Sequence, residues 1–287
     1  MGQEATGVRT GTPAAEGYRM PAEWERHEAT WIGWPHNTTD WPGKFALIAW
    51  VYGEIVRKIA PGEKVRVLVE SKSHEGTARR ILSRVGAEPS RVEFFRIPTN
   101  RGWTRDSGPV FVRRSGERKS EVAISRFRFN GWARYPDFRK DDAVPERLAR
   151  ALGMTLFRAT SGGRDVVLEG GAIDVNGRGA LVTTEECLLD PKLQVRNPGF
   201  GRRQYEGIFR DSLGAGNVLW LKSGIAGDDT HGHVDDICRF VNPTTAVLCR
   251  EQNPKDENYR ALEENRERLE GMRLEDGSHL EVVSLPM

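Results

Sequence analysis

Short stretches of β-branched and aliphatic residues alternate along the chain with longer stretches in which apolar residues recur every three or four positions. The short stretches predict strands at 65–69, 92–97, 110–113, 121–129, 172–175, 180–184, 217–221, 245–249 and 280–284. The longer ones predict helices at 73–85, 143–152, 202–213 and 256–269, the first of them begun by a serine cap. Short strand pairs recur between single helices, with no linker-like break and no Gly-rich phosphate-binding loop. We therefore expect one α/β domain built from repeated small units.

The N-terminal residues and the apolar stretches indicate where the domain begins and in which cellular compartment the protein is expected. Residues 1–19 are rich in Gly, Thr, Ala and Glu without periodicity, and predict a loose tail ahead of a single domain at 20–287. The first twenty residues contain no apolar signal core. The nearest approach to a membrane span, 45–52, is far shorter than the ~18 apolar residues required. We therefore expect a cytoplasmic protein with no membrane partner.

Composition narrows the function classes. The chain of 287 residues carries 43 basic and 41 acidic side chains, a net charge of +2, and so lacks the positive charge of a nucleic-acid or membrane-surface protein. Hydrophobic residues make up 38% of it, which is enough for a real core and excludes a disordered chain. The three cysteines, Cys187, Cys238 and Cys249, include no Cys-x-x-Cys pair. That argues against a disulfide framework or a Cys-rich zinc site and favours a reducing compartment.

Two polar segments carry candidate binding groups. Segment 103–109 sets Trp103 near Asp106, which suits a cation that needs a flat apolar face and a carboxylate, although a solvated turn gives the same pattern. In segment 168–172, Glu169 precedes two glycines, which let the backbone approach a ligand closely or simply form a bulge. Neither segment is specific by itself.

The densest group of ionisable residues is segment 228–236, which holds four aspartates and two histidines. In a strand, the period of two would put Asp229, His231, His233 and Asp235 on one face. A metal site would explain the cluster, and so would an acid–base pair beside a cation-binding carboxylate. Both alternatives stay open on the residues alone.

Segment 126–135 interleaves arginines with aromatic residues, a pattern that could stack on single-stranded nucleic acid. A half-buried strand with Phe127 and Phe129 facing inward, followed by a loop, explains the same pattern. Because the chain has no basic excess elsewhere, we favour the strand and expect no nucleic-acid partner.

Taken in this order, the segments resemble the agmatine deiminase family, which is grouped with the bacterial-type peptidylarginine deiminases in the pentein superfold. The resemblance runs from 20 to 287 and rests on 20–24 with His27, Trp31 and 34–35, and on 103–109, 129–132, 168–171, 183–189, 196–198 and 232–235. It implies a five-bladed α/β propeller with its active site in the central channel. It also implies hydrolysis of a small guanidino substrate to a ureido product and ammonia, without cofactor or metal, as in putrescine and polyamine biosynthesis.

The resemblance also implies roles for individual residues. Asp106 and Asp235 would accept paired hydrogen bonds from the planar guanidinium, and Trp103 would pack along the substrate. Glu169 would orient and charge His233, which would protonate the departing ammonia and then activate water. A Cys thiolate would attack the guanidinium carbon, because a covalent intermediate splits one difficult displacement into two easier ones.

Two residues bear on the rest of the substrate, beyond its guanidinium group. Asp229, with Asp228, is a candidate partner for the distal ammonium of agmatine. Arg101 stands where family members commonly have an acidic residue. If Arg101 faces the channel, it would favour a substrate that ends in a carboxylate, such as arginine or a peptide C-terminus. If it faces solvent, agmatine remains the first expectation. The sequence leaves a homodimer open.

The sequence departs from the family at the nucleophile. The family's Gly-Gly-Gly-x-x-His-Cys segment is absent from these residues, and the pattern stops within the last blade. We assign none of the three cysteines to this role, since buried cysteines in or near strands are usually inert, and we expect no turnover without that segment. Two alternatives remain. One is a metal-dependent hydrolase built on His231 and His233 with Asp229 and Asp235, and the other is a catalytically inactive, ligand-binding propeller.

Overall fold

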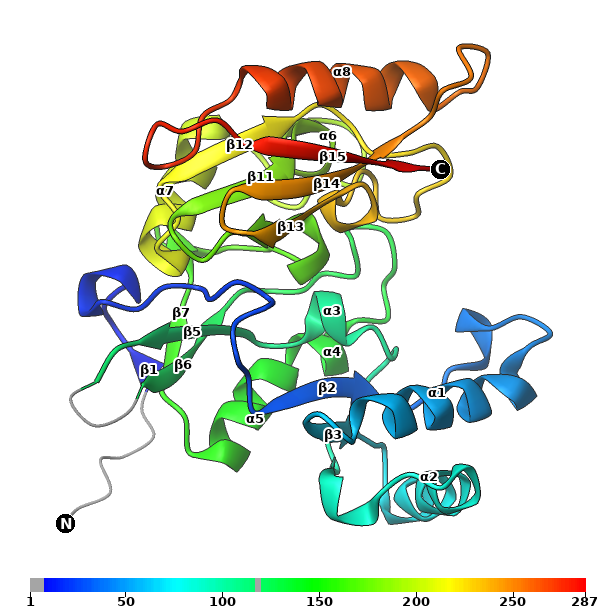
Figure 1. The fold of residues 1–287 in the computed structure, drawn as a ribbon. Coiled ribbons are helices and arrows are strands. Elements are labelled where there is room, and N and C mark those ends of the chain that lie inside the picture. The colour runs from blue at the N-terminus through cyan, green and yellow to red at the C-terminus, as the bar shows by residue number, and fades with distance from the viewer. Residues whose placement is uncertain (1–7, 117–119) are drawn as a thin grey trace.

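The structure, a computed structural model, describes residues 8–116 and 120–287, and its larger sheets are built in a similar way (Figure 1). Three of them begin with an antiparallel strand pair, after which a helix leads to a third strand that pairs in parallel with the second. In the sheet formed within residues 29–95, both strand pairings are parallel, and a helix lies in each of the two connections between strands. The predicted α/β architecture of repeated small units is confirmed.

Four units follow one another along the described chain. The first contains β2 (Ala29–Gly33), α1 (Phe45–Ile59), β3 (Lys64–Leu68), α2 (Lys72–Val85) and β4 (Val92–Phe95). The second contains β5 (Val110–Arg114), β6 (Glu121–Arg126), α4 (Arg139–Asp142), α5 (Val144–Leu152) and β7 (Leu156–Arg158). The third contains β10 (Asp174–Val175), β11 (Ala180–Thr184), α6 (Glu185–Leu189), α7 (Arg202–Leu213) and β12 (Asn217–Leu221). The fourth contains β13 (Cys238–Asn242), β14 (Thr245–Arg250), α8 (Tyr259–Gly271) and β15 (Glu281–Pro286).

Short elements lie before and between the units. They are β1 (Val8–Arg9), α3 (Thr104–Ser107), β8 (Thr160–Ser161), β9 (Arg164–Asp165), and the 3-10 turns η1 (Ala14–Glu16), η2 (Thr38–Asp40), η3 (Pro89–Arg91), η4 (Gly170–Ala172) and η5 (Val234–Asp236). Three of these, α3, η4 and η5, carry the candidate site described below.

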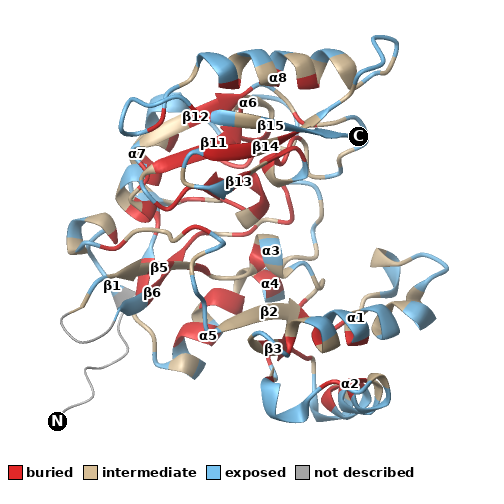
Figure 2. Cartoon of the chain, in the orientation of Figure 1, coloured by how far each residue is buried: buried red, intermediate tan, exposed pale blue. Residues whose placement is uncertain are grey.

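Apolar side chains of neighbouring units pack into shared cores. The buried residues of the third and fourth units concentrate on strands such as β11 and β14 (Figure 2). The second and third units share a core that includes Phe157 of β7 and Phe209 of α7. The third and fourth share one that includes Leu221 of β12 and Leu262 of α8. All five residues of β11 are buried, and the strand contributes side chains to both of these cores.

Two elements of the first unit had no counterpart in the sequence prediction, β2 and α1. Helix α1 exposes Leu47, Trp50 and Val51 while it buries Val56. Because its apolar residues lie on more than one face, they do not mark a single stripe, and the helical period is hidden. None of the described helices is both long enough and apolar enough to cross a membrane.

The N-terminal segment differs from the loose tail we expected. β1 pairs in parallel with β7, and Tyr18 is buried with its ring 5.5 Å from that of Phe157. The segment from residue 8 onward is therefore part of the packed domain, because it completes the edge of the second sheet. Residues 1–7 lie outside the described part of the chain.

Candidate active site

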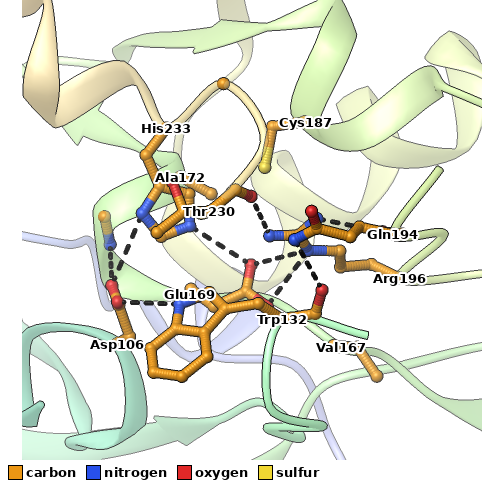
Figure 3. Close-up of polar contacts among 12 residues, drawn as sticks. Asp106, Trp132, Val167, Glu169, Ala172, Cys187, Gln194, Arg196, Thr230 and His233 are labelled. Carbon is orange, nitrogen blue, oxygen red and sulfur yellow. Dashed lines mark hydrogen bonds and ion pairs between the residues drawn. The ribbon is translucent and has the colours of Figure 1, made fainter. Parts of the chain in front are cut away.

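Three one-turn helices bring the candidate side chains together between the units. Asp106 lies in α3, Glu169 directly precedes η4, and His233 directly precedes η5. Since η4 contacts both α3 and η5, three residues that are far apart in the sequence converge (Figure 3). Their side chains are withdrawn from solvent, with exposed fractions of 10%, 0% and 3%.

The imidazole of His233 lies among three carboxylates. Its Nδ1 is 3.8 Å from Asp106 Oδ1 and 3.8 Å from Asp235 Oδ1, and its Nε2 is 3.7 Å from Glu169 Oε2. These separations are ion pairs rather than hydrogen bonds, and Nε2 has no hydrogen-bond partner among the described residues. Burial alone would lower the pKa of His233, but the three carboxylates outweigh it and raise the pKa. The ring can therefore hold a proton near neutral pH.

Glu169 is kept ionised by a buried arginine. Arg196 Nε lies 3.2 Å from Glu169 Oε1 and 3.3 Å from Oε2, and neither side chain reaches solvent. The rest of the guanidinium donates to the carbonyl oxygens of Gln194 and Thr230. Burial would raise the pKa of Glu169, but Arg196 and His233 together lower it to about 2. Glu169 is thus a permanent negative charge beside the imidazole.

Asp106 is held by two hydrogen-bond donors. The indole N–H of Trp132 donates to Oδ2 at 3.0 Å, and the backbone N–H of Gly171 donates to Oδ1 at 3.0 Å. Burial raises the pKa of Asp106 to about 6, against the opposing effect of His233. Gly171 leaves no room for a side chain, because a Cβ there would lie 2.5 Å from His233 Nδ1 and 2.7 Å from Asp106 Oδ1.

Asp235 and Trp103 lie at the more open side of the site. Asp235 belongs to η5, and its Oδ2 is 3.5 Å from Arg105 Nε. Burial raises the pKa of Asp235, while His233 and Arg105 oppose the rise. Trp103 precedes α3, is 38% exposed, and packs its ring 5.3 Å from that of Trp41. Asp235 therefore adds a second carboxylate beside His233 Nδ1, and the Trp103 ring is partly open to solvent.

The segment 228–236 is not a strand, so the expectation that Asp229, His231, His233 and Asp235 share one face is wrong. Asp228 accepts hydrogen bonds from the backbone N–H groups of Thr230, Gly232 and His233, which folds the segment into a turn that ends in η5. The φ angles of 65° at His231 and 85° at Gly232 reverse the chain there.

The two histidines of this turn consequently have different partners. Nε2 of His231 is 3.0 Å from Asp190 Oδ2, and its Nδ1 is 3.5 Å from Glu186 Oε1. His233, by contrast, faces Asp106, Asp235 and Glu169. The structure therefore brings together Asp106, Glu169, His233 and Asp235 but not His231.

The two residues considered for the substrate tail are both paired with other side chains. Asp229 accepts a hydrogen bond from the Tyr135 hydroxyl at 2.7 Å and forms an ion pair with Arg134 at 2.5 Å. Arg101 forms ion pairs with Asp40 at 2.5 Å and Asp137 at 3.2 Å, and its guanidinium lies 4.4 Å from the centre of the Tyr135 ring. Its positive charge is offset by these two aspartates.

One group of side chains has the donor set of a metal site. Ligand atoms of Glu169, Cys187 and His233 lie within 4.8 Å of one another. However, the guanidinium of Arg196 occupies both oxygens of Glu169, so a divalent cation would meet a fixed positive charge. Burial also raises the pKa of the Cys187 thiol, which disfavours the thiolate that would bind a metal.

Comparison with known proteins agrees with the chemistry of this site. The sequence profile of the Porphyromonas-type peptidyl-arginine deiminase family matches residues 19–287. The chain belongs to this family. The resemblance inferred from the sequence is thereby confirmed.

Individual members of the family are similar over almost all of this chain. The agmatine deiminase of Ectopseudomonas mendocina is 34% identical over 285 residues, which cover 97% of this chain and 73% of the relative. The agmatine deiminase of the plant Medicago truncatula is 34% identical over 280 residues, 96% of this chain and 72% of the relative. A solved structure of the Enterococcus faecalis agmatine deiminase superposes with a TM-score of 0.87 at 29% identity, covering 98% of this chain and 74% of that chain.

Two residues that build the site received no role from the sequence. Trp132 and Arg196 both lie in segments that carry the family resemblance, yet nothing in their neighbours indicates what they contact. An arginine is usually exposed, so the complete burial of Arg196 against Glu169 is not foreseeable from the residue type. The one signal in the sequence that Arg196 has a role was its position directly before Asn197 and Pro198, within a segment that carries the family resemblance.

Proposed function

We propose that this chain binds agmatine or a closely related guanidino compound and, together with the family's nucleophilic Cys segment, hydrolyses it to the ureido product and ammonia, as a hydrolase of C–N bonds in amidines. The observation that carries the proposal is the His233 imidazole, which has two carboxylates at Nδ1 and a third at Nε2. Such a site is electronegative, aromatic on one side and contains an acid–base group. The names of the relatives in the family support the same substrate.

The carboxylates of Asp106 and Asp235 are proposed to bind the substrate guanidinium. Both lie 3.8 Å from the same nitrogen of His233, so a planar cation between them would also contact the imidazole. A guanidinium presents N–H donors in a fixed plane, which carboxylates accept in pairs. Trp103, at the exposed side, would cover the methylene chain.

His233 is proposed to move the protons. A thiolate attacks the guanidinium carbon and forms a C–S bond; the C–N bond then breaks as His233 gives its proton to the departing ammonia. His233 next takes a proton from water, whose oxygen attacks the same carbon, and the C–S bond breaks to return the thiolate. Glu169 stabilises the protonated imidazole throughout, because Arg196 keeps it ionised.

The thiolate is not proposed to come from Cys187, Cys238 or Cys249, but from the Cys of the family's Gly-Gly-Gly-x-x-His-Cys segment, which these 287 residues do not contain. Burial raises the pKa of all three thiols, and the first two are fully enclosed. A thiol with a raised pKa is a poor nucleophile near neutral pH. These three cysteines are therefore proposed to be structural.

Agmatine is preferred over arginine or a peptidyl arginine. The residue that would favour a substrate ending in a carboxylate is Arg101, and its charge is offset by Asp40 and Asp137. The alternative of a metal-dependent hydrolase is less favoured, because His231 faces Asp190 and Glu186. The proposal includes a five-bladed arrangement of the family fold, a single domain, a cytoplasmic location and no cofactor.

The test is agmatine binding to the purified chain by titration calorimetry. Asp235→Asn is expected to weaken binding at least tenfold, because a charged partner of the guanidinium is lost. Asp236→Asn is the matched control: this neighbour in η5 is exposed, and its substitution should leave affinity unchanged. Equal affinity of wild type and Asp235→Asn would contradict the proposed site. Any ammonia that the chain releases should be unaffected by Cys187→Ser.

A further inference from the structure

The loop at residues 130–135 approaches the candidate site from the second unit and contributes one side chain to it. Trp132 is buried, and its indole N–H donates to Asp106 Oδ2 at 3.0 Å, as Figure 3 shows. The other oxygen of the same carboxylate accepts the N–H of Gly171. The two donors approach different oxygens, so together they fix the rotation of the carboxylate as well as its position.

The backbone of this loop is held in a rarely populated conformation. The φ angles of Gly131, Trp132 and Ala133 are 66°, 59° and 52°, all in the left-handed region that residues with a Cβ disfavour. A side chain at position 131 is excluded, because its Cβ would lie 2.3 Å from the carbonyl oxygen of Tyr135. Unfavourable backbone conformations of this kind persist only where surrounding contacts enforce them, and they concentrate at functional sites.

Contacts on several sides enforce this conformation. The side chain of Gln194 donates to the carbonyl oxygen of Trp132 at 3.1 Å, and Asn130 Oδ1 accepts the N–H of Ala133 at 2.8 Å. The Trp132 ring packs edge-on against Phe129 at 5.0 Å and Tyr135 at 5.9 Å. The loop is therefore built to aim the indole N–H in one direction.

We propose that Trp132 is a positioning residue, whose indole N–H holds the Asp106 carboxylate in the orientation and the ionised state that guanidinium recognition requires. This inference rests on the proposed function, because it assigns Asp106 to the guanidinium. It goes further by naming the group that prepares Asp106 for that role. An N–H donor stabilises the ionised carboxylate and not the neutral acid, so it opposes the effect of burial.

Several ionisable groups surround Asp106 and act on the same equilibrium. They are His233 before η5, Asp235 in η5, Glu169 before η4, and Arg196 beyond Glu169. Glu169 and Asp235 disfavour the ionised form of Asp106, and His233 favours it. Trp132 is the side-chain donor to Asp106 and is neutral, so its N–H can be removed without changing the net charge of the site.

The first arm of the experiment follows the indole N–H signals of the ligand-free, nitrogen-15-labelled chain by NMR as the pH is changed. The Trp132 signal, assigned by its loss in Trp132→Phe, should titrate with a midpoint near the pKa of Asp106, about 6. The titration should disappear in Asp106→Asn. A Trp132 signal that does not respond to Asp106→Asn would overturn the inference, whatever the chain binds.

The second arm measures agmatine affinity between pH 5 and 8. Wild-type affinity should fall as the pH drops below about 6, since the protonated Asp106 carboxyl loses its charge. Trp132→Phe keeps an aromatic ring for Phe129 and Tyr135 but removes the donor. It should weaken binding at pH 7.5 about tenfold and move the midpoint of the pH dependence upward.

Trp220→Phe is the matched control for the second arm. Trp220 is also buried and also donates its indole N–H to a carboxylate, that of Glu206 at 3.1 Å, but outside the site. Its substitution should change neither the affinity nor the midpoint. If Trp132→Phe behaves like Trp220→Phe while Asp106→Asn loses binding, Trp132 only fills space and the inference fails. If wild type does not bind agmatine but the first arm succeeds, the proposed function fails instead.

Discussion

The pKa values of two buried carboxylates in the site are shifted in opposite directions by their surroundings. Glu169 faces the guanidinium of Arg196, and its pKa is lowered to about 2. Asp106 has only neutral N–H donors within hydrogen-bond distance, and burial raises its pKa to about 6. The same functional group thus serves once as a fixed charge and once as a group that titrates near neutral pH.

The close packing of Gly171 against both Asp106 and His233 can be tested by adding a single carbon atom, the Cβ of an alanine. In Gly171→Ala, the added Cβ would lie within 2.7 Å of both side chains, so at least one of them must move. Since the φ of Gly171 is not in the left-handed region, alanine can adopt this backbone and the chain should still fold. We expect the affinity for agmatine to fall at least tenfold by calorimetry.

Gly76→Ala is the control for this substitution, because a Cβ at that position in α2 would have no atom within 4 Å apart from its chain neighbours and the backbone of its own helix. It should bind agmatine like wild type. If Gly171→Ala also binds like wild type, the site tolerates displacement of Asp106 or His233, and the close packing has no role in recognition.

At the scale of elements, strands and helices could be predicted from the sequence where a short segment carries its own hydrophobic period or turn signal. The strand at 65–69 and the helix at 202–213 were predicted and correspond to β3 and α7. The alternating valines of the strand pack in one core, and the apolar stripe of the helix packs in another. The segment 228–236 was interpreted with the wrong period. Its conformation is set by Asp228, which accepts three backbone N–H groups, and short-range capping of this kind overrides strand periodicity.

Helix α4 shows how one short element supports a loop of another unit. Asp141 is 1% exposed and accepts the backbone N–H of Asn100 at 2.7 Å and of Arg101 at 3.2 Å, just before Trp103. Burial raises the pKa of Asp141 to about 7. In the unfolded chain the ordinary value is about 3.9.

This difference in pKa predicts a pH-dependent contribution to stability. Between about pH 4 and 7 the unfolded chain ionises Asp141 while the folded chain keeps it protonated, so its contribution to the free energy of unfolding falls as the pH rises. The fall is on the order of 1.4 kcal/mol per pH unit and ends near pH 7. Asp141→Asn cannot ionise, so the stability of wild type relative to this variant should decrease from pH 4.5 to 6.5. Urea unfolding of both proteins at several pH values measures this; a constant difference would contradict it.

At the scale of the whole molecule, the residues of the site could be predicted from the sequence, but their convergence in space could not. The family resemblance supplied Asp106, Glu169, His233 and Asp235 as a set, whereas spacing alone gave no reason for them to meet. They meet because α3, η4 and η5 lie where successive units adjoin, and each turns the chain toward the same point. The burial of Arg196, which gives Glu169 its charge, depends on that assembly and has no local signature.

A ligand in such a site should stabilise the molecule as a whole. It would contact residues from the three loops that join the four units, and every unfolding event that separates those units would release it. At an agmatine concentration 100 times Kd, the free energy of unfolding should rise by about 2.7 kcal/mol and the Tm by several degrees. Thermal unfolding with agmatine measures this, with 1,4-diaminobutane as the control ligand, since it has amines but no guanidinium. The rise should be absent with the diamine and reduced to about half or less in Asp235→Asn. Equal stabilisation of wild type and Asp235→Asn by agmatine would mean that it binds elsewhere on the chain.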